Sequence, residues 1–135
     1  MDYRTLGASG CVVSNYCLGT MTFGTETDEA GAHRQLDRFA EAGGTLVDTA
    51  DVYSNGASEE IIGRWFASRP AAVTEPMVVA TKGRFGPEGS GNGEGLSARH
   101  LTRALDGSLR RLGLDAVDLY QLHAFDPHAT HCENT

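Results

Sequence analysis

The hydrophobic positions along the chain follow two alternating patterns, one with helical spacing and one of short continuous runs. Hydrophobic residues three or four positions apart predict helices over residues 28–42, 58–69 and 97–112. Polar side chains suited to capping stand at the start of these segments, and residues that end helices follow them. The expected caps are Thr27, Ser58 and Ser97, and the expected stops are Gly43, Pro70 and Gly113.

Short hydrophobic runs before and between these helices predict β-strands. The runs cover residues 16–21, 45–48, 77–81 and 116–122. The third run is apolar on both faces, which is typical of a parallel strand that is covered on both sides. Two further runs flank a Ser-Gly turn and predict an amino-terminal β-hairpin; they cover residues 3–7 and 11–14.

The order of these elements is a hairpin followed by four strands that alternate with three helices. Strict alternation predicts an α/β fold with right-handed crossovers and a parallel sheet. The two common forms, an open doubly wound sheet and a (β/α)8 barrel, both bind ligands at the carboxyl ends of the strands. Four strands correspond to half of such a barrel.

Composition excludes several classes of protein. The 135 residues suit one domain, and the net charge of −7 with no basic run argues against a nucleic-acid partner. No hydrophobic run approaches the length of a membrane span, and none follows the amino terminus as in a signal peptide. The three cysteines, Cys11, Cys17 and Cys132, lack CxxC spacing, so we expect reduced thiols in a cytoplasmic protein and no metal site.

A glycine-rich stretch over residues 84–96 invites comparison with a phosphate-binding loop. It fails the GxGxxG pattern, because Gly91 and Gly93 are followed by Leu96, and it has no Gly-Lys-Ser/Thr ending. We therefore interpret it as a surface loop.

Three of the predicted strands run into ionisable residues. Asp48, Lys82 and His123 each follow a hydrophobic run directly, and an ionisable group there is costly unless it has a partner. Because the carboxyl ends of parallel neighbours meet at one rim, we expect Asp48 and Lys82 to form an ion pair. Tyr53 lies five residues after Asp48, close enough in sequence to return over the same rim.

These four residue types permit acid-base chemistry on a carbonyl group. A nearby ammonium stabilises a phenolate and lowers the pKa of a phenol, so Tyr53 beside Lys82 is a candidate general acid for a carbonyl oxygen. His123 can donate a hydrogen bond to the same oxygen. None of the four can supply a hydride, so a reduction would require a cofactor.

Each residue alone also has a plainer interpretation. Asp48 can be a capping residue, Lys82 a solvated strand end, Tyr53 a loop aromatic and His123 a rim histidine with satisfied hydrogen bonds. The residues by themselves leave both interpretations open.

Several motifs, in order along residues 3–127, point to a family. The motifs are Tyr3-Arg4-x-Leu6-Gly7-x-Ser9-Gly10, Leu18-Gly19-Thr20-Met21-Thr22-Phe23-Gly24, Asp48-Thr49-Ala50-Asp51-x-Tyr53-Ser54-x-Gly56-x-Ser58-Glu59, Ala80-Thr81-Lys82, Ser108-Leu109-Arg110-Arg111-Leu112 and Asp118-Leu119-Tyr120-Gln121-Leu122-His123. The chain resembles the amino-terminal half of the aldo-keto reductases, NAD(P)H-dependent carbonyl reductases built on a (β/α)8 barrel. It looks most like the branch that includes bacterial reductases and potassium-channel β-subunits.

This resemblance implies roles for particular residues. Tyr53 would be the proton donor, Lys82 and Asp48 would tune it, and His123 would orient the carbonyl group of a small-molecule substrate. The cofactor would be NADPH, with NADH as the alternative. The residues expected beside its nicotinamide are Gly19, Thr20, Met21 and Asp48, and those expected to wall the substrate pocket are Met21 and Phe23.

The chain also departs from the family. Aldo-keto reductases continue through four more βα units, which carry most contacts to the phosphates and adenine of the cofactor. We therefore expect a truncated domain over residues 1–127 and an unstructured tail unlike the family over residues 128–135. Half a barrel exposes strand edges and apolar interior, which predicts self-association through those edges.

Two other interpretations remain open at this point. The chain can be a non-catalytic fragment or interaction module that retains a relic site. It can also be an open α/β sheet protein with an unrelated ligand, which a non-sequential strand order would favour.

Overall fold

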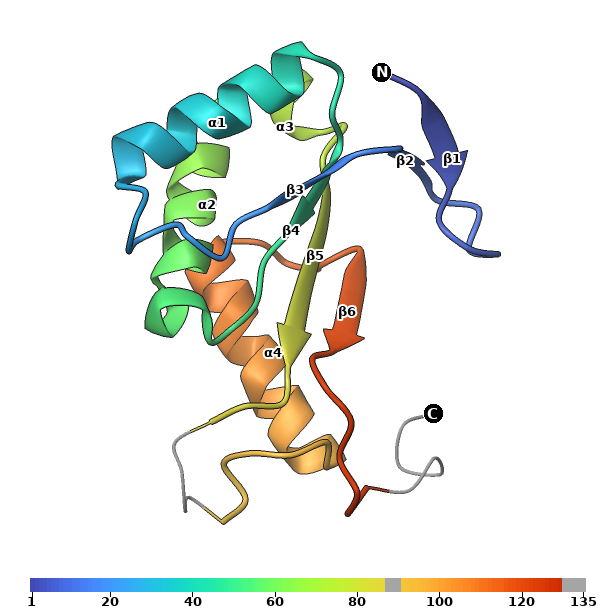
Figure 1. Cartoon of the computed structure of the whole chain (residues 1–135), viewed down its shortest axis with the longest axis vertical. Helices are drawn as coiled ribbons and strands as arrows, with labels where there is room; N and C mark the ends of the chain where they lie inside the picture. Colours follow the sequence, from blue (N-terminus) through green and yellow to red (C-terminus); the bar gives the residue numbers. More distant parts are fainter. Residues whose placement is uncertain (87–90, 130–135) are drawn as a thin grey trace.

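The computed structural model describes residues 1–86 and 91–129. It contains an antiparallel hairpin, a four-stranded parallel sheet and helices packed on that sheet (Figure 1). The strands are β1 (Tyr3–Thr5), β2 (Val12–Ser14), β3 (Cys17–Gly19), β4 (Leu46–Asp48), β5 (Val78–Gly83) and β6 (Leu119–Leu122). The helices are α1 (Glu29–Glu41), α2 (Ala57–Ser68), α3 (Ala71–Thr74) and α4 (Ala98–Leu112), and a 3-10 turn, η1 (Tyr53–Gly56), precedes α2. The predicted α/β class and amino-terminal hairpin are confirmed.

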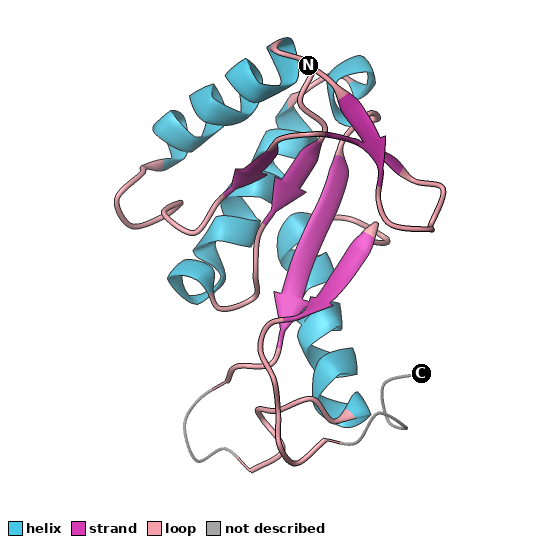
Figure 2. Ribbon diagram, turned by 45° about the vertical axis from the view of Figure 1, so that its right-hand side comes forward, coloured by secondary structure: helices cyan, strands magenta, loops and turns pink. Residues whose placement is uncertain are grey.

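The four-stranded sheet has the order β3-β4-β5-β6, and all its neighbours are parallel. Strand order thus follows chain order, as in a (β/α)8 barrel, whereas a doubly wound sheet reverses its order at a switch point. The structure agrees with the amino-terminal half of such a barrel. In the register, Gly19 lies opposite Asp48 and Lys82 lies opposite Gln121. The carboxyl ends of the strands therefore form one rim, toward which the arrowheads point in Figure 2.

Helices α1, α2 and α4 lie on one face of the sheet (Figures 1 and 2). The core beneath them includes Leu36 of α1, Ile62 and Trp65 of α2, and Leu112 of α4, all fully buried. Burying a side chain of this kind stabilises the fold by roughly 1.5–3 kcal/mol relative to leaving it exposed. Trp65 also donates its indole N–H to the Asp37 carboxylate at 2.8 Å, which joins α2 to α1.

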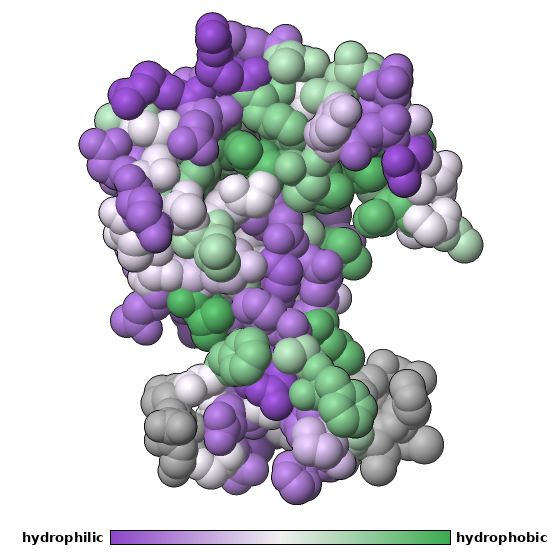
Figure 3. Space-filling view, viewed as in Figure 1, coloured by the Kyte–Doolittle hydropathy of each residue, from purple (hydrophilic) through white to green (hydrophobic). Residues whose placement is uncertain are grey.

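The opposite face of the sheet carries no helix in the described part of the chain. In the space-filling view this face has a polar centre with hydrophobic side chains on either side (Figure 3). Exposed large hydrophobic side chains include Val12, Tyr16, Leu122 and Phe125.

Gly63 allows α2 and α4 to approach closely. A Cβ atom at this position would lie 2.4 Å from the carbonyl oxygen of Arg111 and 2.8 Å from that of Leu112. Because both neighbours are backbone atoms at the end of α4, they cannot move aside without shifting the helix. A glycine is therefore required at this contact.

The observed helix ends correct two of the predicted caps. Helix α1 is capped by Asp28 and not by Thr27, since the Asp28 carboxylate accepts the Gly31 N–H at 2.7 Å. Helix α2 begins at Ala57, so Ser58 lies inside its first turn and its buried hydroxyl bonds elsewhere. The predicted cap of α4 is confirmed, because Ser97 Oγ accepts the His100 N–H, and so is its stop at Gly113, which has φ +66°.

The strands differ from prediction at their ends. Strand β5 extends to Gly83 and so contains Lys82, because the parallel ladder with β6 continues past the hydrophobic run. The short helix α3 was not predicted from the sequence. It follows Pro70, whose fixed φ suits the start of a helix. Residues 87–90 of the glycine-rich loop and residues 130–135 of the predicted tail lie outside the described residues.

Candidate active site

Lys82 lies at the centre of the rim and uses all three of its ammonium protons. Its Nζ donates to Asp48 Oδ2 at 2.6 Å, to the carbonyl oxygen of Thr49 at 2.8 Å and to the phenol oxygen of Tyr53 at 3.2 Å. A lysine ammonium has three donors and no acceptor, so its orientation here is fixed. The structure thus brings Asp48, Lys82 and Tyr53 together, as the sequence predicted.

Asp48 is held through both of its carboxylate oxygens. Oδ2 accepts from Lys82, and Oδ1 accepts from the Gln121 amide Nε2 at 2.8 Å. Gln121 lies in β6, two residues before His123, and the two-residue period of a strand places both on one face. The sequence analysis did not assign Gln121 to the site, because its partner depends on the register of the parallel strands.

Three buried hydroxyl groups fix the backbone beneath the rim. Ser58 Oγ lies 3.0 Å from Thr49 Oγ1 and 2.9 Å from Thr20 Oγ1, and Thr20 Oγ1 donates to the carbonyl oxygen of Asp48 at 3.0 Å. All three side chains are fully buried. Because Ser58 is in the first turn of α2, these bonds connect that helix to the ends of β3 and β4. They also hold Thr49, whose carbonyl accepts from Lys82.

A strained turn returns Tyr53 to the rim. The Tyr53 N–H donates to the carbonyl oxygen of Ala50 at 3.2 Å, which turns the chain directly after β4. Ser54 and Asn55 then adopt left-handed conformations with φ +50° and +53°, which are uncommon for residues other than glycine. Ser54 Oγ donates to the carbonyl oxygen of Phe23 at 2.6 Å and so anchors the turn. Strained backbone of this kind persists where the surrounding contacts hold it.

His123 lies edge-on to two aromatic rings. Its ring centroid is 5.7 Å from that of Tyr53 and 5.0 Å from that of Phe85. Partial burial, and then the nearby Lys82 ammonium, lower the pKa of His123, so the neutral imidazole is favoured. Its Nδ1 is buried without a hydrogen-bond partner among the described residues. We call Asp48, Tyr53, Lys82 and His123, which the structure brings together, the rim site.

The residues expected beside a nicotinamide and a substrate have different surroundings. Gly19 ends β3 beside Asp48, and a Cβ atom there would meet no atom within 4 Å. Met21 is 66% exposed, whereas Thr20 is fully buried and uses its hydroxyl within the protein. Phe23 is also fully buried and packs in the core, so its position does not support the predicted role as a wall of the substrate pocket.

A buried charged cluster lies under the turn that carries Tyr53. Glu59 is fully buried; its carboxylate accepts from Thr81 Oγ1 at 2.6 Å and from Arg111 Nε at 2.7 Å. Asp51 is close to this pair, and its Oδ1 is buried without a partner among the described residues. Burial, and then the Glu59 carboxylate, raise the pKa of Asp51 to about 6, although Arg111 opposes the shift. Sequence reasoning missed this cluster.

The raised pKa of Asp51 predicts a pH-dependent effect of Asp51→Asn on stability. The folded protein binds the Asp51 proton more tightly than the unfolded chain, so this stabilisation is present below the unfolded pKa and is lost as pH rises through about 6. A neutral asparagine avoids the cost of the buried carboxylate. We expect the free energy of unfolding of the variant, relative to wild type, to increase between about pH 4 and about pH 7.5. Urea unfolding at both pH values measures this, and a difference independent of pH would contradict it.

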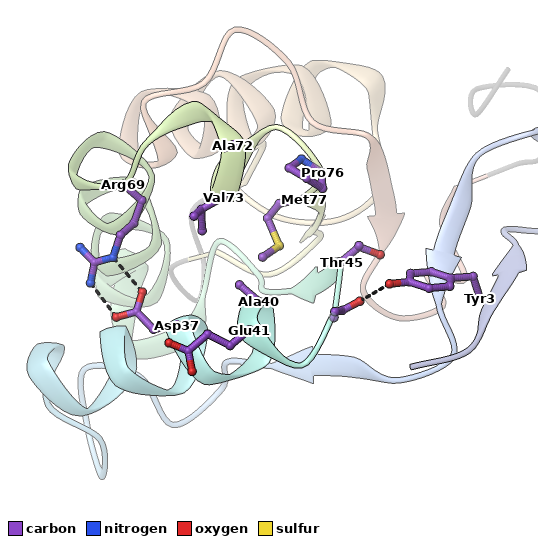
Figure 4. Close-up of a pocket in the computed structure, with 12 residues that line it drawn as sticks. Tyr3, Asp37, Ala40, Glu41, Thr45, Arg69, Ala72, Val73, Pro76 and Met77 are labelled. Atoms are coloured by element: carbon purple, nitrogen blue, oxygen red, sulfur yellow. Dashed lines mark hydrogen bonds and ion pairs between the residues drawn. The ribbon is translucent and has the colours of Figure 1, made fainter.

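A separate cavity lies at the amino ends of the strands, away from the rim site. It has a volume of about 440 Å³ and is lined by the segments that precede β4 and β5, by α3 and by Tyr3 of the hairpin. Figure 4 shows Arg69 paired with Asp37 at its edge, and Arg69 Nε lies 2.7 Å from Asp37 Oδ1. The Tyr3 hydroxyl donates to the carbonyl oxygen of Gly43 at 2.8 Å, which ties the hairpin to this end of the sheet.

Two further findings apply to residues 1–86 and 91–129 only. None of the helices there is both long and apolar enough to cross a membrane. Within the same ranges, no three or more His, Cys, Asp or Glu side chains gather in a way that could hold a metal ion.

Cys17, at the start of β3, has its pKa raised to about 11 by burial and by the Asp48 carboxylate, so its thiol stays protonated.

A phenol, an ammonium, a carboxylate and a neutral imidazole at the carboxyl rim of a parallel sheet define an acid-base site. The profile of the Aldo/keto reductase family matches residues 15–135. The chain belongs to the aldo/keto reductase family. The match runs past the boundary predicted at residue 127, and the structure of residues 130–135 is not described, so the predicted tail stays a prediction.

Individual relatives agree with this family. The chain is 42% identical to the "Uncharacterized oxidoreductase YrpG" of Bacillus subtilis, over 93% of this chain and 41% of that protein. It is 39% identical to the "Probable voltage-gated potassium channel subunit beta" of Oryza sativa subsp. japonica, over 93% and 38%. It is 36% identical to the "Norsolorinic acid reductase" of Aspergillus flavus, over 92% and 35%. The chain thus spans less than half the length of each of these relatives.

Proposed function

We propose that the rim site reduces an aldehyde or ketone to an alcohol with a reduced nicotinamide cofactor. One observation carries the proposal: the Tyr53 phenol oxygen accepts a hydrogen bond from Lys82 Nζ at 3.2 Å, and Lys82 is itself bound to Asp48 at 2.6 Å. Tyr53 is the proton donor to the carbonyl oxygen. As the proton leaves, the Lys82 ammonium stabilises the negative charge that the phenol oxygen gains.

His123 positions the carbonyl group. The lowered pKa keeps its imidazole neutral, so the ring can donate an N–H to the same oxygen without adding a positive charge. Its edge-on contacts with Tyr53 and Phe85 hold the plane of the ring. Asp48, fixed at both oxygens by Lys82 and Gln121, keeps the ammonium aimed at the phenol.

The residues at the ends of β3 and β4 fit a nicotinamide. Space is open above Gly19, Met21 is largely exposed, and no helix of the described residues covers this face of the sheet. Gly19, Met21 and Asp48 would hold the ring, and Thr20 contributes through its buried support of Asp48. When bound, the cofactor would supply the hydride that none of these side chains can donate. By resemblance to the family we propose NADPH, with NADH as the alternative.

The test is carbonyl-dependent consumption of the cofactor by the purified protein. NADPH and NADH are each offered with a panel of aldehydes and ketones, and loss of the reduced cofactor is followed by absorbance, with carbonyl omitted as the control. We expect consumption only when both carbonyl and cofactor are present, and faster consumption with NADPH. A folded protein that binds neither cofactor would overturn the proposal.

A further inference from the structure

The cavity of about 440 Å³ at the amino ends of the strands lies at the opposite end of the sheet from the rim site. Its walls come from the end of α1, from α3, from the residues that lead into β4 and β5, and from the hairpin (Figure 4). All of its lining residues belong to the described part of the chain, and none belongs to the rim site. Sites for small molecules usually measure about 300–1,000 Å³, so this volume suits one.

Apolar side chains from three segments form the body of this cavity. Ala40 of α1, Val73 of α3 and Met77, which precedes β5, point toward a common space in Figure 4. Met77 is buried, and Ala40 and Val73 are half-buried. Ala72 and Pro76 extend this lining to the surface. A ligand with an apolar body would remove this surface from water, which favours binding.

Tyr3 gives the cavity an aromatic wall that is fixed in position. Its hydroxyl donates to the carbonyl oxygen of Gly43 at 2.8 Å. A Cβ atom at Gly43 would lie 2.9 Å from the Tyr3 hydroxyl oxygen, and Gly43 has φ +82°, so this position favours a glycine. On the other side of the cavity, the Met77 N–H donates to the carbonyl oxygen of Thr74 at 3.0 Å. Walls that are held in this way lower the entropic cost of binding a ligand.

The charged groups of the lining leave one negative charge unbalanced. Arg69 is paired with Asp37 through two hydrogen bonds, from Nε to Oδ1 at 2.7 Å and from Nη2 to Oδ2 at 2.8 Å. Glu41, the last residue of α1, forms no ion pair within residues 1–86 and 91–129. Arg38, in the same turn, does not line the cavity. The carboxyl end of a helix also carries partial negative charge, so the end of α1 adds to the effect of Glu41.

We propose that this cavity binds a small hydrophobic ammonium, in which a protonated amine is attached to one apolar ring. The ring packs against Ala40, Val73 and Met77, and the ammonium lies at the mouth beside the Glu41 carboxylate. An ammonium has donors only, which suits a carboxylate, and the face of an aromatic ring such as Tyr3 also attracts cations. An anionic ligand would lack a partner, because the guanidinium of the lining is already paired. The proposal does not depend on the reductase activity, because no residue of the rim site contributes.

Calorimetric titration of the whole chain tests the site with benzylamine, which is protonated at neutral pH, and with benzyl alcohol, a neutral molecule of similar shape. We expect saturable binding of both probes. Benzylamine should bind about two- to fivefold more tightly, which is the effect of an exposed ion pair.

Ala72→Phe places a ring at the mouth of the cavity and tests its location. This variant should weaken the binding of both probes about tenfold or more, because their apolar body loses its burial. Ala72 is exposed, so the variant should unfold at the wild-type urea concentration.

Two matched charge variants test the role of Glu41. Glu41→Gln should remove the preference for benzylamine over benzyl alcohol. Glu75→Gln removes an exposed carboxylate that follows α3 and does not line the cavity, so it should keep the preference.

Three results would overturn the proposal. In the first, the folded wild type binds neither probe saturably or shows no preference for benzylamine. In the second, Ala72→Phe binds both probes as wild type does. In the third, Glu75→Gln reduces the preference as much as Glu41→Gln, since the net charge of the chain would then explain it.

Discussion

Tyr53→Phe is expected to lower the turnover number for carbonyl reduction by about 10²- to 10⁴-fold, the usual contribution of a positioned general acid. The substitution removes the one atom that can give a proton to the carbonyl oxygen from this position. It leaves the aromatic ring and its edge-on contact with His123. Lys82 keeps its bonds to Asp48 and Thr49, so the ammonium stays in place. Steady-state kinetics should show the loss in kcat with little change in KM.

Tyr16→Phe is the matched control for this variant. Tyr16 is 73% exposed and lies before β3, outside the rim site, so its loss should leave kcat unchanged. A Tyr53→Phe enzyme that keeps more than about a tenth of wild-type kcat would show that another group protonates the carbonyl oxygen.

Arg111→Met is expected to reduce the free energy of unfolding by roughly 3–5 kcal/mol, because it leaves a buried carboxylate without its counter-ion. Glu59 is fully buried, and its Oε2 lies 2.7 Å from Arg111 Nε. Thr81 would remain as a hydrogen-bond donor to the other oxygen, but a hydroxyl does not neutralise the charge. Chemical denaturation at neutral pH measures the difference.

The double variant Glu59→Met, Arg111→Met separates loss of the ion pair from loss of packing. Replacing both charged partners by hydrophobic residues is often close to neutral, so the double variant should be more stable than Arg111→Met alone. Arg99→Met, at an exposed position of α4, should change stability by no more than about 0.5 kcal/mol. If Arg111→Met were as stable as Arg99→Met, the ion pair between Arg111 and Glu59 would contribute nothing to the stability of the fold.

Much of the fold could be predicted from local pattern. The helical period located α1, α2 and α4, and alternation of strands with helices gave a parallel sheet whose order is sequential. Prediction failed where a cap was chosen by residue type alone. Thr27 and Ser58 are both good capping residues, but Asp28 reaches the free N–H of Gly31, and Ser58 is held by Thr20 and Thr49.

Part of the candidate site could also be predicted from the sequence. Asp48, Lys82 and His123 stood out because each follows a hydrophobic run, and Tyr53 stood out through its distance from Asp48. Gln121 shared a face with His123, but its partner could not be identified without the register of β5 and β6. The buried position of Phe23 also depends on how the chain packs, since the same side chain next to a strand end could equally have faced the rim.

The sequence by itself determined which side chains could do chemistry and on which kind of element they stand. Tertiary structure alone decided their partners, because the decisive contacts join residues far apart in the chain. Gln121 and Asp48 are 73 positions apart, and Arg111 and Glu59 are 52 apart. The spacing of hydrophobic residues shows only which side chains share a face within one helix or one strand. Whether a buried carboxylate finds an ammonium, an amide or a guanidinium depends on strand register and helix packing, which the folded chain sets as a whole.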